Sequence, residues 1–346
     1  MLKKISGILA LFVLLIACDN KPRMVLYTWS DMFPPEILTG FESETGIRVQ
    51  YVNFEYNETM LARLQADRRG SYDLIIADDY MVETVIQEGL AARLDRSLLT
   101  NFRNIDPFFQ GHFYDPTDGF TVPYGAGVVT IVYDPRLVDT PINSYADLWN
   151  TALEQKLGIL GNFRVINGMA LKVMGESYNT NNLGTIQAAG NLLLQLAPNI
   201  RLIRDYSLDD ELLSGEISAA VMYTEMVTEA IRARRDLRMI FPTEGIGFGI
   251  MPAFIPHNAP NPGAAHAFLN YILDPRRGAE CFEYLGYYST FSASNPYIDP
   301  GQREFLILPE EFLNLDIMEM IGNVSDEARE LHNEIWTAFR RAAGQE

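Results

Sequence analysis

Cysteine and histidine are scarce in this chain, and their positions do not form the usual disulfide and metal sites. The 346 residues include two cysteines and four histidines. Cys281 sits in a helix-like stretch, where we expect a small buried apolar side chain. The histidines lack the close spacing of metal ligands: His112, His257, His266 and His332. We therefore expect no metal ion in this protein.

The short motifs of common catalytic and nucleotide-binding sites are also missing. The sequence contains neither a Gly-x-Ser-x-Gly elbow nor a phosphate-binding glycine loop. Gly245 to Gly249 has alternate glycines without the context of a dinucleotide site, and we interpret it as a flexible approach to a strand at Ile250. Asp115 to Gly119 lacks the spacing of a calcium loop and is interpreted as a turn. We expect a protein that is not an enzyme and needs no cofactor.

Basic residues are outnumbered by acidic residues. The chain has 27 lysines and arginines against 45 aspartates and glutamates, for a formal net charge of -18. Such a balance disfavours nucleic acid and anionic membrane surfaces as partners. The length and a hydrophobic content of 48% suffice for two domains with substantial cores. We therefore expect a globular protein that does not bind nucleic acid.

The N-terminus has the features of an export signal. An apolar run at residues 8–17 follows Lys3 and Lys4, and it is too short to span a bilayer. Leu15-Ile-Ala-Cys18 resembles the lipobox of bacterial lipoproteins, which implies a signal peptide at 1–17 and a lipid on Cys18. With Cys18 modified, no intrachain disulfide can form. We expect a protein of the periplasmic space, anchored to the cell membrane by this lipid. The alternative is an ordinary signal peptide with a chance cysteine.

Predicted strands and helices alternate along the chain. Strands are predicted at 25–28, 47–51 and 72–77, and helices at 34–46, 57–70 and 82–89, with Asn57 as a helix cap. A strand at 128–133 leads into a second α/β region, whose last helix runs from about 326 to 341 with Ser325 as its cap. This order predicts an α/β fold with mainly parallel sheets.

No linker rich in proline, glycine or serine separates the two regions. We therefore expect two lobes between which the chain crosses more than once. After the signal, residues 18–131 and about 251–295 are assigned to lobe 1. Residues from about 132 to 250 and 296–346 are assigned to lobe 2.

Two polar clusters each follow directly after a predicted strand: Trp29-Ser30-Asp31 and Asp78-Asp79-Tyr80. Each combines an aromatic ring with a carboxylate. Ligands of open parallel sheets bind beyond the carboxyl ends of the strands, so we expect both clusters at one edge. Either cluster alone also fits an ordinary polar loop, and their combination is what predicts a ligand site.

Several stretches share the pattern of one family of transport proteins. They are Tyr27-Thr-Trp-Ser-Asp-Met-Phe-Pro-Pro35, Phe41-Glu-Ser-Glu-Thr-Gly-Ile47, Tyr56-Asn-Glu-Thr-Met60, Gly70-Ser-Tyr-Asp-Leu74, Leu99-Thr-Asn-Phe102, Val122-Pro-Tyr124, Ser144-Tyr-Ala-Asp-Leu-Trp149, Phe241-Pro-Thr-Glu-Gly245 and Gly286-Tyr287. Together they resemble the spermidine/putrescine-binding proteins, which are the periplasmic components of polyamine ABC importers. The resemblance implies a type II-like periplasmic-binding-protein fold of two α/β lobes, closing on a ligand held in the cleft between them.

The resemblance also implies a set of ligand-binding residues. Aromatic walls hold ammonium groups and methylenes, and they correspond here to Trp29, Tyr80, Tyr223 and Tyr287. Ser30 corresponds to a hydroxyl position and Asp31 to a carboxylate position of the family. Other positions depart from the family's carboxylates, aromatic rings and glutamine: Met32, Asn162, Val165, Gly249, Met251 and Ile321. Among these, Asn162 is kept as a candidate ligand-binding residue.

A buried ammonium group needs a counter-charge, so these departures leave two interpretations. In the first, other carboxylates pair with the ammonium groups of the ligand, and the candidates are Asp78, Asp79, Asp205 and Glu225. Alternatively, the ligand is shorter, less charged or more apolar.

The sequence thus predicts a monomeric, lipid-anchored receptor. It would capture a putrescine- or spermidine-type cation and pass it to an ABC permease in the membrane. Two alternatives stay open, namely a protein of the same fold that binds a less charged solute, and a ligand sensor without transport.

Overall fold

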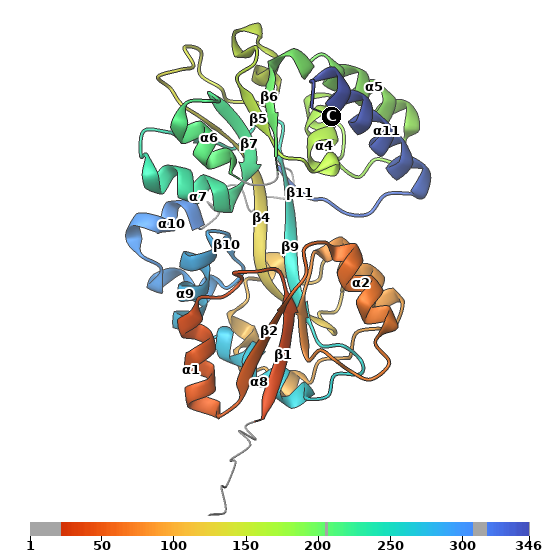
Figure 1. The fold of residues 1–346 in the computed structure, drawn as a ribbon, viewed down its shortest axis with the longest axis vertical. Helices are drawn as coiled ribbons and strands as arrows, with labels where there is room; N and C mark the ends of the chain where they lie inside the picture. The colour runs from red at the N-terminus through yellow and green to blue at the C-terminus, as the bar shows by residue number, and fades with distance from the viewer. Residues whose placement is uncertain (1–21, 205–206, 307–316, 346) are drawn as a thin grey trace, which may run out of the picture.

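The computed structural model describes residues 22–204, 207–306 and 317–345 (Figure 1). Two lobes lie along the long axis and are joined by the long strands β4 (Thr121–Tyr133) and β9 (Ile246–Phe254). The buried apolar residues form two large cores, and along β4 the first core ends at Val128 and the second begins at Val129. We call the residues around the first core lobe 1 and those around the second core lobe 2. Cys18 and Asp205 lie outside the described residues.

In lobe 1, three parallel strands each lead into a helix. The elements are β1 (Arg23–Thr28), α1 (Pro35–Thr45), β2 (Arg48–Asn53), α2 (Asn57–Ala66), β3 (Leu74–Ile76) and α3 (Asp79–Gln87). Strand β1 pairs with β2 on one side and with β3 on the other, and β3 pairs antiparallel with β9. Pro35 stands in the first turn of α1, and Gly46, at a φ of 73°, ends the helix as the sequence predicted.

Lobe 2 repeats this architecture with strands in the order β4-β7-β5-β6. Its elements are β5 (Leu157–Ile159), α4 (Phe163–Val173), α5 (Leu183–Leu194), β6 (Ile200–Ile203), α6 (Leu208–Ser214), β7 (Ala219–Tyr223), α7 (Thr224–Ala233), β8 (Arg238–Ile240) and α11 (Asp326–Ala342). Strand β5 is parallel to both neighbours. Helix α11 packs on α4 and α5, and the Ser325 Oγ accepts from the Ala328 N–H at 3.2 Å, which is the predicted cap. The predicted α/β fold is confirmed. The sheet is mixed, with parallel pairs within each lobe and antiparallel pairs along β4 and β9.

The connection between the lobes begins earlier in the sequence than predicted. Strands β4 and β9 pair antiparallel, and β11 (Met318–Met320) adds to β9 in parallel. The sequence suggested strands from residues 128 and 250, but they start at Thr121 and Ile246. The interpretation of 245–249 as a flexible approach was wrong from Ile246 onward. Ile246, Phe248 and Ile250 are buried on one side of β9, and glycines alternate with them on the other.

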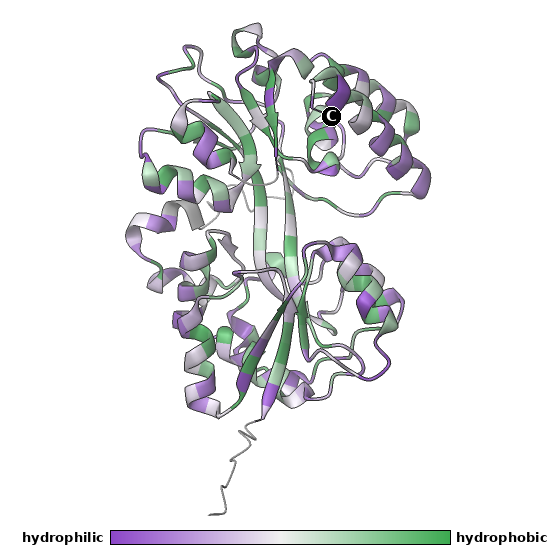
Figure 2. Ribbon diagram, viewed as in Figure 1, coloured by the Kyte–Doolittle hydropathy of each residue, from purple (hydrophilic) through white to green (hydrophobic). Residues whose placement is uncertain are grey.

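The remaining elements lie in both lobes and beside the lobe junction. They are α8 (Pro262–Ile272), α9 (Pro275–Leu285), β10 (Tyr288–Ser289), α10 (Pro300–Leu306) and 3₁₀ turns at Arg96–Leu98, Thr100–Asn104, Pro107–Phe109, Ala146–Trp149, Thr151–Leu153, Ala197–Asn199 and Ser292–Tyr297. Strand β10 pairs with β4, and α10 packs on α7. Figure 2 shows mostly apolar strands and helices banded with polar residues, as expected for sheets covered by amphipathic helices. Among the described helices, none combines the length and apolarity that crossing a membrane requires.

Candidate functional site

A pair of glycines marks the place where the two crossing strands are open to solvent. Gly127 is the one residue of β4 that is not buried, and Gly249 is the one residue of β9 that is not buried. They face each other in the strand register. A Cβ on Gly249 would come within 4 Å of one described atom, the Asp79 Oδ2 at 3.5 Å, and a Cβ on Gly127 would meet the Tyr287 and Tyr223 rings. We call Gly127 and Gly249 the glycine floor.

Tyr223 and Tyr287 form walls beside this floor. Tyr223 ends β7, and its hydroxyl accepts a hydrogen bond from the Asn162 Nδ2 at 3.1 Å. The Asn162 Oδ1 accepts from the first backbone N–H groups of α4, which holds the side chain at the carboxyl end of β5. The Tyr287 Cε1 would lie 3.4 Å from a Cβ on Gly127. Three residues predicted from the sequence are thus brought together on one side of the floor.

Glu225 stands in the first turn of α7, next to Tyr287. Its Oε2 atom is buried and has no hydrogen-bond partner among the described residues. Burial raises the pKa of this carboxyl to about 7, and Asp209 adds to the rise, while hydrogen bonds from its own backbone N–H and from Tyr287 lower it. Near neutral pH, Glu225 is therefore divided between the ionised and the protonated form.

The lobe 1 side of the site is formed by the start of α3. The Asn57 Nδ2 donates to the Asp78 Oδ2 at 2.7 Å and to the Tyr80 hydroxyl at 3.2 Å. Asn57 was predicted as the cap of α2, but it is the first residue of that helix and its side chain binds α3 instead. Burial raises the pKa of Asp78 to about 6, although the hydrogen bond from Asn57 opposes the rise. Asn57 therefore orients both predicted ligand residues.

Burial and nearby polar groups both affect the Tyr287 hydroxyl. Burial raises the pKa of this hydroxyl well above its ordinary value, and the nearby Glu225, Tyr223 and Asp78 side chains raise it further.

The Asp79 carboxylate is bound by the backbone beside Gly249. Its side chain is 3% exposed, and its Oδ2 accepts from the Ile250 N–H of β9 at 2.7 Å. Its Oδ1 accepts from the Tyr80 N–H, also at 2.7 Å. Burial raises the pKa of Asp79 to about 8, with a smaller contribution from Asp78. Asp79 thus ties α3 to the crossing strand, and both of its oxygens are engaged by backbone.

The turn with Trp29, Ser30 and Asp31 lies at the same sheet edge as Asp78. Strands β1 and β3 are parallel with Tyr27 opposite Ile75, so the residues that follow them emerge side by side, as predicted. Trp29 is half-buried, and its ring lies 5.0 Å from the Phe54 ring between centroids.

The backbone of this turn is held by Tyr51. The Tyr51 hydroxyl donates to the Trp29 carbonyl at 2.7 Å and accepts from the Met32 N–H at 3.1 Å. Asp31 has a φ of 58°, and both Ser30 and Asp31 are exposed. Among the described residues, no side-chain hydrogen bond or ion pair engages the Asp31 carboxylate, which leaves it available to a ligand.

Apolar side chains close the floor at both ends. The Met251 Cε would lie 2.8 Å from a Cβ on Gly125, and the Ile321 Cδ1 would lie 2.8 Å from a Cβ on Gly247. Each therefore covers the glycine next to the floor. Val165 is 3% exposed and belongs to the core of lobe 2. These positions contribute no polar group, so charge recognition depends on the acids at the sides of the floor.

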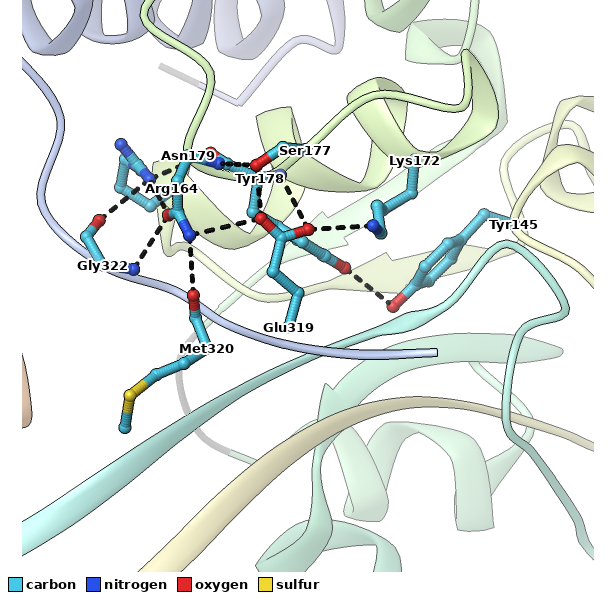
Figure 3. A network of polar contacts seen from close by, with 9 residues as sticks. All are labelled: Tyr145, Arg164, Lys172, Ser177, Tyr178, Asn179, Glu319, Met320 and Gly322. Atoms are coloured by element: carbon cyan, nitrogen blue, oxygen red, sulfur yellow. Dashed lines mark hydrogen bonds and ion pairs between the residues drawn. The ribbon is translucent and has the colours of Figure 1, made fainter. Parts of the chain in front are cut away.

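A polar network fixes β11 to lobe 2 (Figure 3). The Glu319 carboxylate accepts from the Lys172 Nζ at 2.9 Å, the Asn179 Nδ2 at 3.2 Å, the Tyr178 N–H at 3.3 Å and the Ser177 hydroxyl. Burial opposes ionisation of Glu319, but hydrogen bonds from Ser177 and Lys172 leave its pKa lowered.

The segment after β11 reaches both lobes. The Arg164 Nη2 of α4 donates to the Gly322 carbonyl at 3.1 Å. The Asn323 Nδ2 donates to the Glu83 Oε2 at 2.6 Å and to the Tyr80 carbonyl at 3.3 Å, both in α3. The start of α3, which carries Asp78 and Tyr80, is thereby linked to a segment anchored in lobe 2.

Sequence comparison shows which known proteins this chain is similar to. Residues 36–302 match the family model described as bacterial extracellular solute-binding protein. The chain is 32% identical over 296 residues to the spermidine/putrescine-binding periplasmic protein of Salmonella typhimurium, covering 85% of each. It is 28% identical over 310 residues to the putrescine-binding periplasmic protein SpuD of Pseudomonas aeruginosa, covering 82% of this chain and 84% of that one.

Solved structures agree with the fold. The spermidine/putrescine ABC transporter substrate-binding protein PotD of Streptococcus pneumoniae superposes with a TM-score of 0.86 at 26% identity, over 93% of this chain and 99% of that one. The Tp0655 (TpPotD) lipoprotein of Treponema pallidum superposes with a TM-score of 0.81 at 23% identity, over 92% and 99%. The predicted resemblance and the predicted two-lobed fold are both confirmed.

Proposed function

This chain belongs to the family of bacterial extracellular solute-binding proteins, and on that premise we propose that it captures a polyamine-type cation for an ABC importer. The observation that carries the proposal is the glycine floor at the lobe junction, with two tyrosine walls and an acid from each lobe. The names of its relatives, which include spermidine/putrescine- and putrescine-binding proteins, support the same ligand class.

The chemistry of a polyamine suits these groups. Each ammonium group gains about 0.5 to 2 kcal/mol on an aromatic face, and each buried methylene gains about 0.8 kcal/mol. Carboxylates are required because a buried ammonium without a counter-charge is strongly unfavourable. We assign ligand contact to residues that share the lobe junction: Trp29, Ser30, Asp31, Asp78, Tyr80, Asn162, Tyr223, Glu225 and Tyr287. Asp79, whose oxygens accept from the Ile250 and Tyr80 N–H groups, and Asp205 remain predictions from the sequence.

Isothermal titration of ligand-stripped protein tests the ligand class. Putrescine, spermidine or spermine is expected to bind, and Trp29→Ala is expected to weaken binding at least tenfold, roughly 1.4 kcal/mol, because a stacking face is lost. Tyr297→Ala removes an aromatic ring that is 46% exposed and lies under the Arg276 guanidinium, and it serves as the matched control, with unchanged affinity expected. Absence of heat with all three polyamines in folded, ligand-free protein would refute the polyamine proposal.

A less charged solute of similar size is the second candidate, and one observation favours it. Met251 and Ile321 give the floor apolar ends, which would suit a short or partly apolar ligand. Native mass spectrometry of the protein as purified distinguishes the two candidates by the mass of the molecule that it carries.

We further propose that a lipid on Cys18 anchors the protein at the membrane and that it works as a monomer with a membrane permease. The Leu15-Ile-Ala-Cys18 sequence supports the anchor. Cys18→Ser is expected to move the protein from the membrane fraction to the soluble periplasmic fraction. Unmodified protein that is already soluble would contradict the anchor.

A further inference from the structure

The chain passes from one core to the other directly after β11, and the segment that follows is held by lobe 2. Met320 belongs to the core of lobe 1, whereas Ile321 packs against the core of lobe 2. The Gly322 N–H donates to the Asn179 Oδ1 at 2.8 Å, and the Gly322 carbonyl accepts from the Arg164 Nη2 at 3.1 Å (Figure 3). The backbone at Gly322 is therefore fixed to lobe 2 through both of its polar groups.

Asn323, the next residue, binds helix α3 of lobe 1. Its Nδ2 donates to the Glu83 Oε2 at 2.6 Å and to the Tyr80 carbonyl at 3.3 Å. A side-chain amide nitrogen carries two hydrogens, so these bonds use both of its donors. The Glu83 Oε1 accepts from the Gln87 Nε2 at 3.2 Å, which orients the carboxylate toward Asn323. We call the bonds from Asn323 to Glu83 and Tyr80 the lobe latch.

An aromatic ring of lobe 1 packs beside the same segment. The Phe113 ring lies 5.8 Å from the Tyr114 ring between centroids, at 89° to it, and Tyr114 belongs to the core of lobe 1. A Cβ on Gly322 would lie 3.4 Å from the Phe113 Cε1. The segment that is fixed to lobe 2 therefore contacts lobe 1 at two places, namely at α3 and at Phe113.

We propose that Asn323 is a positioning residue for ligand binding, which holds the lobes together through the lobe latch and slows release of the ligand. The proposal rests on the proposed function for the identity of that ligand.

The geometry of the latch explains how it can act without touching the ligand. Hydrogen bonds weaken steeply with small changes in distance and angle, so only a lobe arrangement close to this one permits both bonds. Their free energy therefore favours this arrangement over more open ones. One of the bonds is made to the Tyr80 carbonyl, so the latch also fixes this predicted wall of lobe 1 relative to the Tyr223 wall of lobe 2. Breaking it should loosen the site from a distance.

Asn323→Asp tests the latch with a side chain of the same size. It replaces both donors by acceptors and places a second carboxylate beside Glu83. Stopped-flow tryptophan fluorescence is expected to show release of spermidine about tenfold faster than from the wild type, with little change in the association rate. Combining Asn323→Asp with Glu83→Gln exchanges donor and acceptor, and this double variant should release spermidine within about threefold of the wild-type rate. A general loss of stability would not be repaired in this way.

The control creates the same repulsion inside lobe 1. The Gln65 Nε2 of α2 donates to the Glu88 Oε2, at the end of α3, at 2.8 Å. Gln65→Glu places two carboxylates together there and leaves the contact between the lobes untouched. It is expected to release spermidine at the wild-type rate, and all variants are expected to give native circular dichroism spectra.

The outcomes separate the latch from the proposed function. Release from Asn323→Asp at the wild-type rate overturns the latch and leaves the polyamine function standing, and so does a double variant that releases spermidine as fast as the single variant. If spermidine does not bind to the wild type, the proposed function is refuted, and small-angle X-ray scattering of the ligand-free proteins decides the latch. A larger radius of gyration for Asn323→Asp than for the wild type supports it, and equal radii overturn it.

Discussion

Gly127→Leu is expected to weaken polyamine binding at least 100-fold. The new side chain would enter the space between the Tyr223 and Tyr287 rings, because a Cβ at this position already lies 3.4 Å from the Tyr287 Cε1. The ligand would lose contact with both rings and with the floor, at about 0.5 to 2 kcal/mol for each aromatic face and about 0.8 kcal/mol for each methylene. Isothermal titration with spermidine measures the change.

A matched substitution separates a blocked site from a damaged fold. Gly263→Leu adds the same side chain at the start of α8, where a Cβ would meet no described atom within 4 Å. It is expected to bind spermidine like the wild type, and both variants are expected to give native circular dichroism spectra. Full affinity in a folded Gly127→Leu protein would show that the ligand lies elsewhere.

Glu319→Ala is expected to lower the free energy of unfolding by about 2 to 4 kcal/mol. The substitution leaves Lys172, whose side chain is 15% exposed, without its carboxylate partner, and it removes the acceptor of Ser177 and Asn179 (Figure 3). Urea unfolding followed by tryptophan fluorescence measures the loss. Since β11 would detach from lobe 2, binding is expected to weaken as well.

A control substitution and the pH dependence of stability test the same network. Glu216→Ala breaks a pair with Arg201 in which both side chains are more than 40% exposed, and it should cost less than about 1 kcal/mol. Because the pKa of Glu319 is lowered in the folded protein, its stabilisation is complete above the ordinary glutamate range and is lost as the pH falls through the folded value. Equal losses in the two variants would contradict the role assigned to this network.

Local sequence patterns were sufficient for most of the architecture. The strands and helices of lobe 1 follow from apolar periodicity, and the ends of α1 follow from Pro35 and Gly46. The apolar pattern gave the wrong start for β9, because glycines within a strand weaken its sequence signal. This strand is stabilised by pairing with β4, which lies far away in the sequence.

The site residues that come directly after strands could be predicted from the sequence. The parallel register of β1 and β3 brings the turn of Trp29 beside Asp78, as the strand-end rule predicts. The binding of Asp79 to the backbone of β9 was not predictable, because its hydrogen bond comes from Ile250, 171 residues away. The role of Gly127 also depends on long-range pairing, since its exposure results from standing opposite another glycine.

A crystal structure of the protein with spermidine bound tests the central claim most directly. Spermidine is expected to lie over Gly127 and Gly249, against the Tyr223 and Tyr287 rings, with an ammonium nitrogen within about 3 Å of a carboxylate oxygen at the lobe junction. Spermidine bound away from the glycine floor, for example in the pocket on lobe 1 lined by Asn270, Tyr271 and Arg277, would contradict the account.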